Sequence, residues 1–179
     1  AWDAAVKGER PGILVIHEWW GHNAYARERA RQLAELGYTA LALDMFGEGK
    51  NASHPQEAME FTNQVMSRAG VASARFEKAL EVLKGHPTVN SDDIGAIGYC
   101  FGGGVALEMA RKGYDLEGIV TFHGGLSTED PAGPGDIKAS LLINHGAADS
   151  FMPKEVVEGF KAEMGSANAD YTFIAYDGA

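Results

Sequence analysis

The single cysteine of the chain, Cys100, stands in the segment Gly98-Tyr-Cys-Phe-Gly-Gly-Gly104, between a run typical of a strand and a run typical of a helix. Its Gly-x-Cys-x-Gly spacing is the cysteine version of the nucleophile elbow, a turn that is too tight for side chains at the flanking positions. Such a turn presents the thiol at a helix N-terminus, where the dipole favours a thiolate and a developing oxyanion. The segment predicts a nucleophile; a buried structural cysteine is the alternative.

The same glycine cluster does not fit the nucleotide-binding motifs. A dinucleotide fingerprint requires glycine in place of Cys100, and a phosphate-binding loop requires Gly-Lys-Ser/Thr where Val105 and Ala106 follow. A thiol redox sensor is less favoured, because the chain has no second cysteine to resolve a sulfenic acid. Nucleophilic and acid–base chemistry needs no cofactor, and we expect none.

Two other segments place charged side chains after apolar runs. Asp149 follows the run that ends at His145, where the elbow architecture places the acid that orients a histidine. Its alternative role is to cap a helix at Pro153. His17-Glu-Trp-Trp-Gly-His22 suggests zinc ligands, but histidines at this spacing point about 140° apart on a helix, so we expect no metal site. Backbone amides of this segment could form half of an oxyanion hole, with the residue after Cys100 forming the other half.

Apolar runs that alternate with amphipathic segments predict an α/β fold, with a doubly wound, mostly parallel sheet and helices on both faces. The expected strands are 13–17, 38–43, 94–99, 119–123, 141–145 and 171–176. The expected helices are 25–36, 55–84 with a break near Gly70, 105–112 and 153–164. Residues 124–138 predict a long loop or lid. A last strand in such a sheet needs cover on both faces, so we expect either a further element after it or cover of that face by something else.

Composition narrows the class of protein. The 179 residues, 45% hydrophobic and 22% charged, predict one globular domain over 1–179. A formal net charge of −10 argues against nucleic acid or an anionic membrane as a partner. A lone cysteine forms no internal disulfide and no apolar run is long enough for a bilayer, so we expect a cytoplasmic protein, as a monomer or small homo-oligomer.

Four segments in order give the chain a resemblance to the dienelactone hydrolase (carboxymethylenebutenolidase) family of the α/β-hydrolase fold. They are Val15-Ile-His-Glu-Trp-Trp-Gly21, Ala42-Leu-Asp-Met-Phe-Gly47, Gly98-Tyr-Cys-Phe-Gly-Gly103 and Gly146-Ala-Ala-Asp149. The resemblance, which extends over nearly the whole chain, implies a hydrolase that cleaves a small-molecule ester, lactone or thioester through a cysteine acyl-enzyme. The alternative is a non-catalytic ligand-binding or regulatory protein on the same fold.

The resemblance also implies a role for individual residues. Cys100 is the nucleophile and Asp149 is the acid partner of the triad. Glu18 is a carboxylate beside the thiol, which stays protonated until substrate binding moves the carboxylate. The backbone N–H groups of Phe101 and Trp19 form the oxyanion hole.

The triad histidine of the family follows a Gly-Ala-x-His pattern, and the matching Gly178-Ala179 ends the sequence, so the resemblance places that histidine beyond Ala179. None of the six histidines present is an obvious replacement, and His145 is the best placed of them. We expect Trp19, Trp20 and His145 at the substrate pocket, with ordinary packing as the alternative for the two tryptophans. Dienelactone specialists bind a substrate carboxylate with arginines, whereas residues 55–67 contain none, which leaves the natural substrate open.

Overall fold

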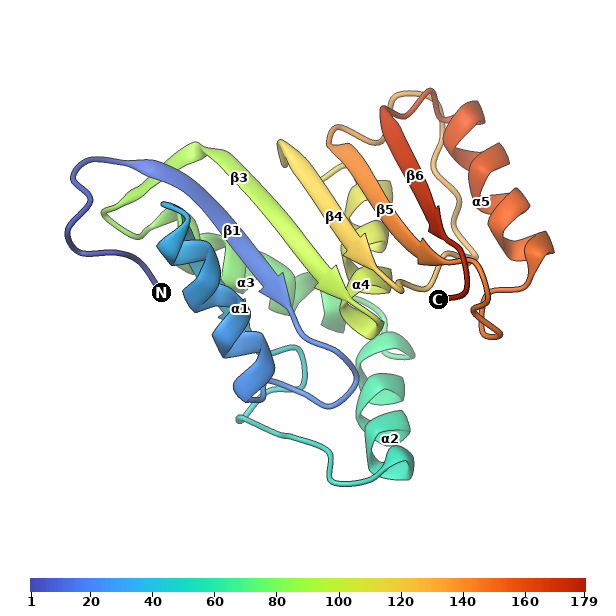
Figure 1. Cartoon of the computed structure of the whole chain (residues 1–179), viewed down its shortest axis with the longest axis horizontal. Coiled ribbons are helices and arrows are strands. Elements are labelled where there is room, and N and C mark those ends of the chain that lie inside the picture. Colours follow the sequence, from blue (N-terminus) through green and yellow to red (C-terminus); the bar gives the residue numbers. More distant parts are fainter.

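A computed structural model describes all 179 residues and contains one six-stranded sheet, in the order β2-β1-β3-β4-β5-β6, in which every neighbouring pair is parallel. Figure 1 shows the strands with their carboxyl ends at one edge. The strands are β1 (Arg10–Ile16), β2 (Thr39–Leu43), β3 (Val89–Tyr99), β4 (Gly118–Phe122), β5 (Ser140–Gly146) and β6 (Tyr171–Tyr176). The helices are α1 (Ala24–Glu35), α2 (Pro55–Met66), α3 (Val71–Lys84), α4 (Phe101–Arg111) and α5 (Lys154–Ser166). The expected doubly wound α/β sheet is confirmed.

The helix boundaries differ from expectation at one important place. α4 begins at Phe101, directly after the cysteine, rather than at residue 105, so Cys100 is the residue that precedes the first helical turn. The break in 55–84 lies where it was predicted, because Gly70 adopts a left-handed conformation with φ of 78° between α2 and α3. None of the five helices is both long enough and apolar enough to cross a membrane.

The sheet is covered unequally on its two faces. α3, α4 and α5 pack on one face, where a cluster of 27 buried residues includes Phe76, Met109 and Phe160. α1 packs on the other face over β1 and β2, with a buried cluster of only three residues, Val15, Ala30 and Ala40. Figure 1 shows α1 on the opposite side of the sheet from α3 and α4. The main core therefore lies between the sheet and α3–α5.

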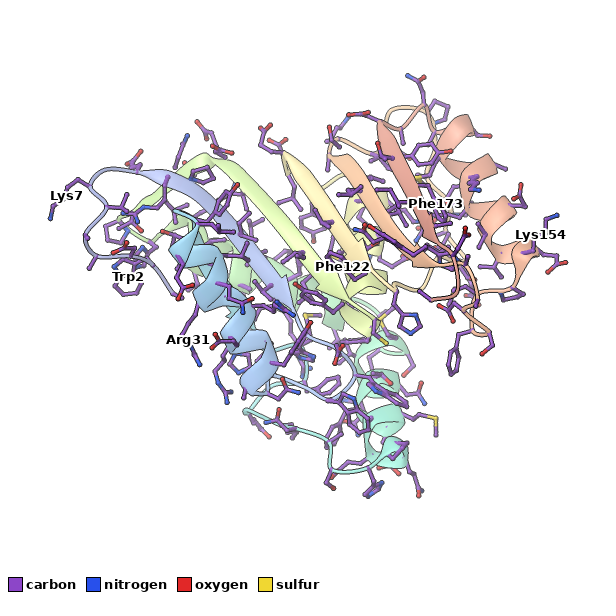
Figure 2. All side chains as sticks on the ribbon, viewed as in Figure 1. Trp2, Lys7, Arg31, Phe122, Lys154 and Phe173 are labelled. Atoms are coloured by element: carbon purple, nitrogen blue, oxygen red, sulfur yellow. The ribbon has the colours of Figure 1, made fainter.

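On the α1 side, the strands farther from α1 carry partly exposed apolar side chains. Phe122 is 39% exposed at the end of β4, and Ile174 and Tyr176 of β6 are 37% and 48% exposed. Figure 2 shows Phe122 near the carboxyl ends of β3 and β4, where it stacks on Tyr99 with 5.4 Å between the ring centroids. In the residues described here, this part of the sheet has no helix over it.

Residues 124–138 form a loop, as predicted, but it is not a free lid. The Arg111 side chain is 3% exposed and donates from Nη2 to the carbonyl of Leu126 at 2.8 Å. Arg111 also pairs with Glu163 of α5 at 2.8 Å, and that carboxylate accepts the N–H of Ala132 at 3.0 Å. The loop is thus anchored to α4 and α5 along its length.

Candidate active site

Cys100 occupies a strained turn between β3 and α4. Its φ of 52° and ψ of −115° lie outside the conformations that a residue with a side chain ordinarily adopts, at a cost of about 1–3 kcal/mol. The Cys100 N–H donates to the carbonyl of Phe122 at 2.8 Å, which ties the turn to β4. A Cβ at Gly98 would lie 2.2 Å from the carbonyl oxygen of Gly102, so the turn admits only glycine there. These are the features of a nucleophile elbow.

The first turn of α4 lies directly against the end of β1. A Cβ at Gly102 would lie 2.4 Å from the carbonyl oxygen of Ile16 and 2.6 Å from that of His17. Because this glycine permits the contact, the residues that follow β1 lie beside Cys100. The cysteine elbow and the 17–22 segment, which are far apart in the sequence, therefore form one site.

Two backbone N–H groups converge on the sulfur of Cys100. They belong to Phe101, the first residue of α4, and to Trp19, in the loop after β1. Burial raises the pKa of the Cys100 thiol, and the negative charges of Glu18 and Asp149 raise it further, while the two N–H groups partly offset these effects. The thiol therefore rests protonated at neutral pH, beside two donors that can hold a negative oxygen.

Glu18 is close enough to the Cys100 thiol for its negative charge to act on it. It is half-buried and lines, together with Cys100 and His123, a cavity of about 380 Å³ between α1 and the ends of β3 and β4. Tyr25, Tyr99, Arg29 and Phe122 complete this cavity. Its charge acts on the thiol through space, since no hydrogen bond joins the two side chains.

Asp149 holds a histidine that the sequence analysis passed over. Its Oδ2 lies 2.6 Å from Nδ1 of His123, and its side chain is only 5% exposed. Oδ1 accepts the N–H of Phe151 at 2.9 Å, whereas α5 is preceded by Pro153 and has no side-chain cap, so Asp149 does not cap that helix. A carboxylate can only accept from Nδ1, which leaves Nε2 of His123 as the free ring nitrogen.

Asn144 of β5 links the strand ends that carry this pair. Its Nδ2 donates to the carbonyl of Thr121 at 3.2 Å, and its carbonyl accepts the N–H of His123 at 3.0 Å. Its Oδ1 accepts the hydroxyl of Tyr176 in β6 at 2.9 Å. His123 has a φ of 54°, so these bonds hold its backbone in a conformation that it would otherwise rarely adopt.

A cavity of about 470 Å³ opens at Cys100 on the α2 side. Its wall is mostly apolar and is formed by residues from the 17–22 segment, α2, α4 and two loops: Trp19, Thr62, Met66, Phe101, Gly104, Glu108, His123, Gly125, Ser127, Phe151 and Met152. Trp19 lines this cavity, as expected, but Trp20 and His145 do not. Trp20 packs edge-on against Trp19, and His145 is 5% exposed and packs against Phe173.

The model of the dienelactone hydrolase family matches residues 3–179. The chain belongs to the dienelactone hydrolase family. The structure of the dienelactone hydrolase-like promiscuous phosphotriesterase P91 from metagenomic libraries is 35% identical, with a TM-score of 0.92 over 99% of this chain and 74% of that one. The carboxymethylenebutenolidase of Pseudomonas putida is 28% identical over 87% of this chain and 70% of its own.

A third relative, protein usf of Aquifex pyrophilus, is 28% identical over 98% of this chain and 77% of its own length. Membership of the dienelactone hydrolase family makes the chain a hydrolase of the lactone or ester type.

The structure brings Cys100, Glu18 and Asp149 to one edge of the sheet, together with the N–H groups of Phe101 and Trp19. Sequence reasoning missed His123. Its signal was its position directly after β4, the strand that pairs with β3, which leads to Cys100.

Proposed function

We propose that the protein hydrolyses carboxylic esters, lactones or thioesters through an acyl-enzyme on Cys100. The observation that carries the proposal is the convergence of two backbone donors, from Phe101 and Trp19, on a strained cysteine at a helix N-terminus. A tetrahedral oxyanion formed by attack of this sulfur would lie beside both donors, which is the arrangement that stabilises acyl transfer.

The reaction has two half-reactions, acylation and deacylation, and in each of them a base takes up one proton and gives it back. A base takes the thiol proton, the Cys100 sulfur attacks the carbonyl carbon, and the oxyanion collapses to a thioester as the alcohol leaves with that proton. Water then gives a proton to the same base, attacks the thioester carbon, and releases the acid as the sulfur regains its proton. Imidazole is suited to both transfers because it exchanges a proton near neutral pH.

Asp149 orients the base, and its Oδ2 has room for one imidazole at a time. In the structure that imidazole belongs to His123, at 2.6 Å. In the family pattern a histidine would stand two residues after Ala179. The carbonyl of Ala179 accepts the N–H of Ala148 at 2.8 Å, and Ala179 lines a cavity with Asp149 and His123, so a histidine in that position would compete for the same oxygen. We propose the family histidine as the triad base and His123 as the second candidate.

Glu18 controls when the thiol ionises. Its negative charge opposes a thiolate on Cys100, and burial of the thiol has the same effect. A substrate at Cys100 that reaches into the 380 Å³ cavity and displaces the Glu18 carboxylate would remove part of this opposition. Without substrate the thiol stays protonated. The enzyme is then protected from alkylation and oxidation, because both reactions require the thiolate.

The wall of the cavity favours a neutral acyl group. Trp19, Met66, Phe101 and Met152 are apolar, and the one carboxylate in the wall is Glu108, which pairs with Arg111 at 2.8 Å. No lysine or arginine lines this cavity. An uncharged ester is therefore the substrate class to assay first. A phosphotriester is a second class, suggested by the 35% identity to P91.

A pre-steady-state assay tests the proposal. Rapid mixing with p-nitrophenyl acetate should release one equivalent of nitrophenol per chain before the slower steady state, and mass spectrometry should find one acetyl group on the peptide that contains Cys100. Cys100→Ala, which fits the small elbow site, should fold normally and show neither signal. A burst of equal size in this variant would contradict the mechanism. Binding of the ester without any burst in the wild-type protein would favour a non-catalytic ligand-binding protein.

A further inference from the structure

His17, which follows β1, is a buried side chain that the proposed reaction does not use. It is 1% exposed, and its ring packs between Phe46, at 4.8 Å between ring centroids, and Phe101, at 5.9 Å. Both ring nitrogens contact the main chain. Nδ1 lies 2.5 Å from the carbonyl oxygen of Glu18, and Nε2 lies 3.1 Å from the backbone nitrogen of Met45.

These two partners fix where the ring carries its proton. The N–H of Met45 is a donor, so Nε2 must accept and has no proton. The carbonyl of Glu18 can only accept, so Nδ1 must be protonated. Burial lowers the pKa of His17, which agrees with a neutral ring. His17 is thus a neutral imidazole with one defined tautomer.

The Glu18 carbonyl belongs to the same peptide unit as the N–H of Trp19. A trans peptide is planar, and its C=O and N–H point in opposite directions, so a bond that holds the oxygen also aims the hydrogen. In this unit the oxygen faces His17 and the N–H faces the sulfur of Cys100. The Glu18 oxygen also accepts the N–H of Gly21, at the longer distance of 3.2 Å.

We propose that His17 is a positioning residue of the oxyanion hole: its Nδ1–H holds the Glu18 carbonyl so that the Trp19 N–H points at the oxyanion. This inference rests on the proposed function of the site. The bond from Met45 to Nε2 keeps the ring in place and connects the hole to the loop after β2. The oxyanion hole thus depends on His17, Glu18 and Trp19, three consecutive residues of the loop after β1. Of these, only Trp19 contacts the reacting atoms.

Two substitutions separate this role from a general packing role. The amide nitrogen of Asn can occupy the place of Nδ1 and donate to the Glu18 carbonyl, but it does not reach Met45. Gln can accept from Met45 at the place of Nε2, but it has no donor at the place of Nδ1. Each variant loses one of the two bonds and keeps a polar side chain, so we expect similar losses of unfolding free energy.

The expected kinetic effects differ. A complete loss of one oxyanion-hole donor costs about 10²–10³ in kcat, and the bond from Gly21 still restrains the peptide, so His17→Gln should lower kcat by about 10- to 100-fold with little change in KM. His17→Asn should retain most of kcat. A trifluoromethyl ketone, whose adduct with Cys100 carries the same oxyanion, should bind the Gln variant more weakly by the factor lost in kcat/KM.

Equal kcat in the wild-type and Gln proteins, or equal losses in Gln and Asn, would overturn the inference. A tautomer measurement covers the case in which a variant fails to fold: the ¹⁵N shifts of the wild-type imidazoles should show His17 protonated on Nδ1 and bare on Nε2 at neutral pH, and the opposite tautomer would also overturn it. Failure of the proposed function has a different signature, namely wild-type turnover that survives Cys100→Ala. The tautomer measurement needs no turnover and decides the inference in that case.

Discussion

Nδ1 of His123 lies 2.6 Å from Oδ2 of Asp149, although the two residues follow different strands and are 26 positions apart. The carboxylate is 5% exposed while the imidazole is half exposed, so the acid is fixed and the histidine borders open cavities. A carboxylate that holds Nδ1 of an imidazole can orient it as a base, and this contact sets the first test.

We expect His123→Gln to slow turnover of a chromogenic ester by the 179-residue protein. General acid–base catalysis is worth about 10²–10⁴-fold, and His123 is the imidazole that Asp149 holds in this chain. Steady-state kinetics with His86→Gln as the control, a histidine at the opposite end of the sheet, would measure the effect. Full activity in the His123 variant would remove it from the mechanism.

Extension of the chain with the Gly-Ala-x-His segment and final helix typical of the family tests the alternative base. We expect the extended protein to turn over faster than the 179-residue protein and to become insensitive to His123→Gln, because the new imidazole takes Oδ2 of Asp149. It should also melt at a higher temperature, because the helix would cover apolar side chains such as Ile174, which is 37% exposed. Equal rates for the two lengths would leave His123 as the base.

Glu18→Gln should increase the rate at which iodoacetamide alkylates Cys100 at neutral pH. Burial raises the pKa of the thiol first and Glu18 adds to it, so removal of this charge lowers the pKa part of the way and increases the thiolate fraction. The midpoint of the rate–pH curve should therefore move to lower pH, while ester turnover does not increase. Glu35→Gln, an exposed change at the end of α1, is the control. A flat or reduced alkylation rate would contradict the gating role.

Gly102→Ala should destabilise the protein by about 2–5 kcal/mol or prevent folding, because its Cβ would lie 2.4 Å from the backbone oxygen of Ile16, which is not free to move. Gly159→Ala is a matched control in an exposed part of α5. No atom lies within 4 Å of a Cβ there, so the change should stabilise by about 0.5–1 kcal/mol. Urea unfolding of the two variants measures the difference, and equal midpoints would show that β1 and α4 can separate at no cost.

Acid should weaken the fold through His17. Burial lowers its pKa in the folded state, so below about pH 6.5 the unfolded chain binds a proton that the folded chain does not. The contribution of this neutral imidazole to the unfolding free energy is complete above about pH 6.5 and is lost progressively as the pH falls below that value. Urea unfolding between pH 5 and pH 7.5 should therefore show a smaller pH dependence in His17→Asn than in the wild type, and parallel curves would contradict this.

The arrangement of the sheet could be predicted because its signals are local. Apolar runs and the break at Gly70 appear in the sequence, and the final strand was predicted with its observed bounds, Tyr171–Tyr176. The start of α4 was placed four residues too late, because a run of three glycines has low helix propensity. Contact with the end of β1, which requires small residues there, favours the helix over that propensity.

The site could be predicted only in part. Cys100 and Asp149 stand in recognisable segments at strand ends, whereas His123 has no motif and is placed by hydrogen bonds between β4 and β5. The role inferred for His17 depends on which way a single peptide unit faces, and spacing in the sequence carries no such information. His145 is buried against Phe173 and lines the cavity that contains Asp149 and His123, which its position at a strand end did not distinguish from simple packing.

The contact between Gly102 and the end of β1 has a consequence for how such enzymes diversify. The groups proposed for the chemistry are attached to the ends of neighbouring strands, whose relative positions are set by the sheet and by this contact. The cavity wall is formed largely by other parts, such as Thr62 and Met66 of α2 and Phe151 in a loop. Mutations in the cavity wall can accumulate without moving the Cys100 sulfur or its oxyanion donors. Proteins that descend from one ancestor can therefore differ in substrate specificity while they keep the same type of reaction.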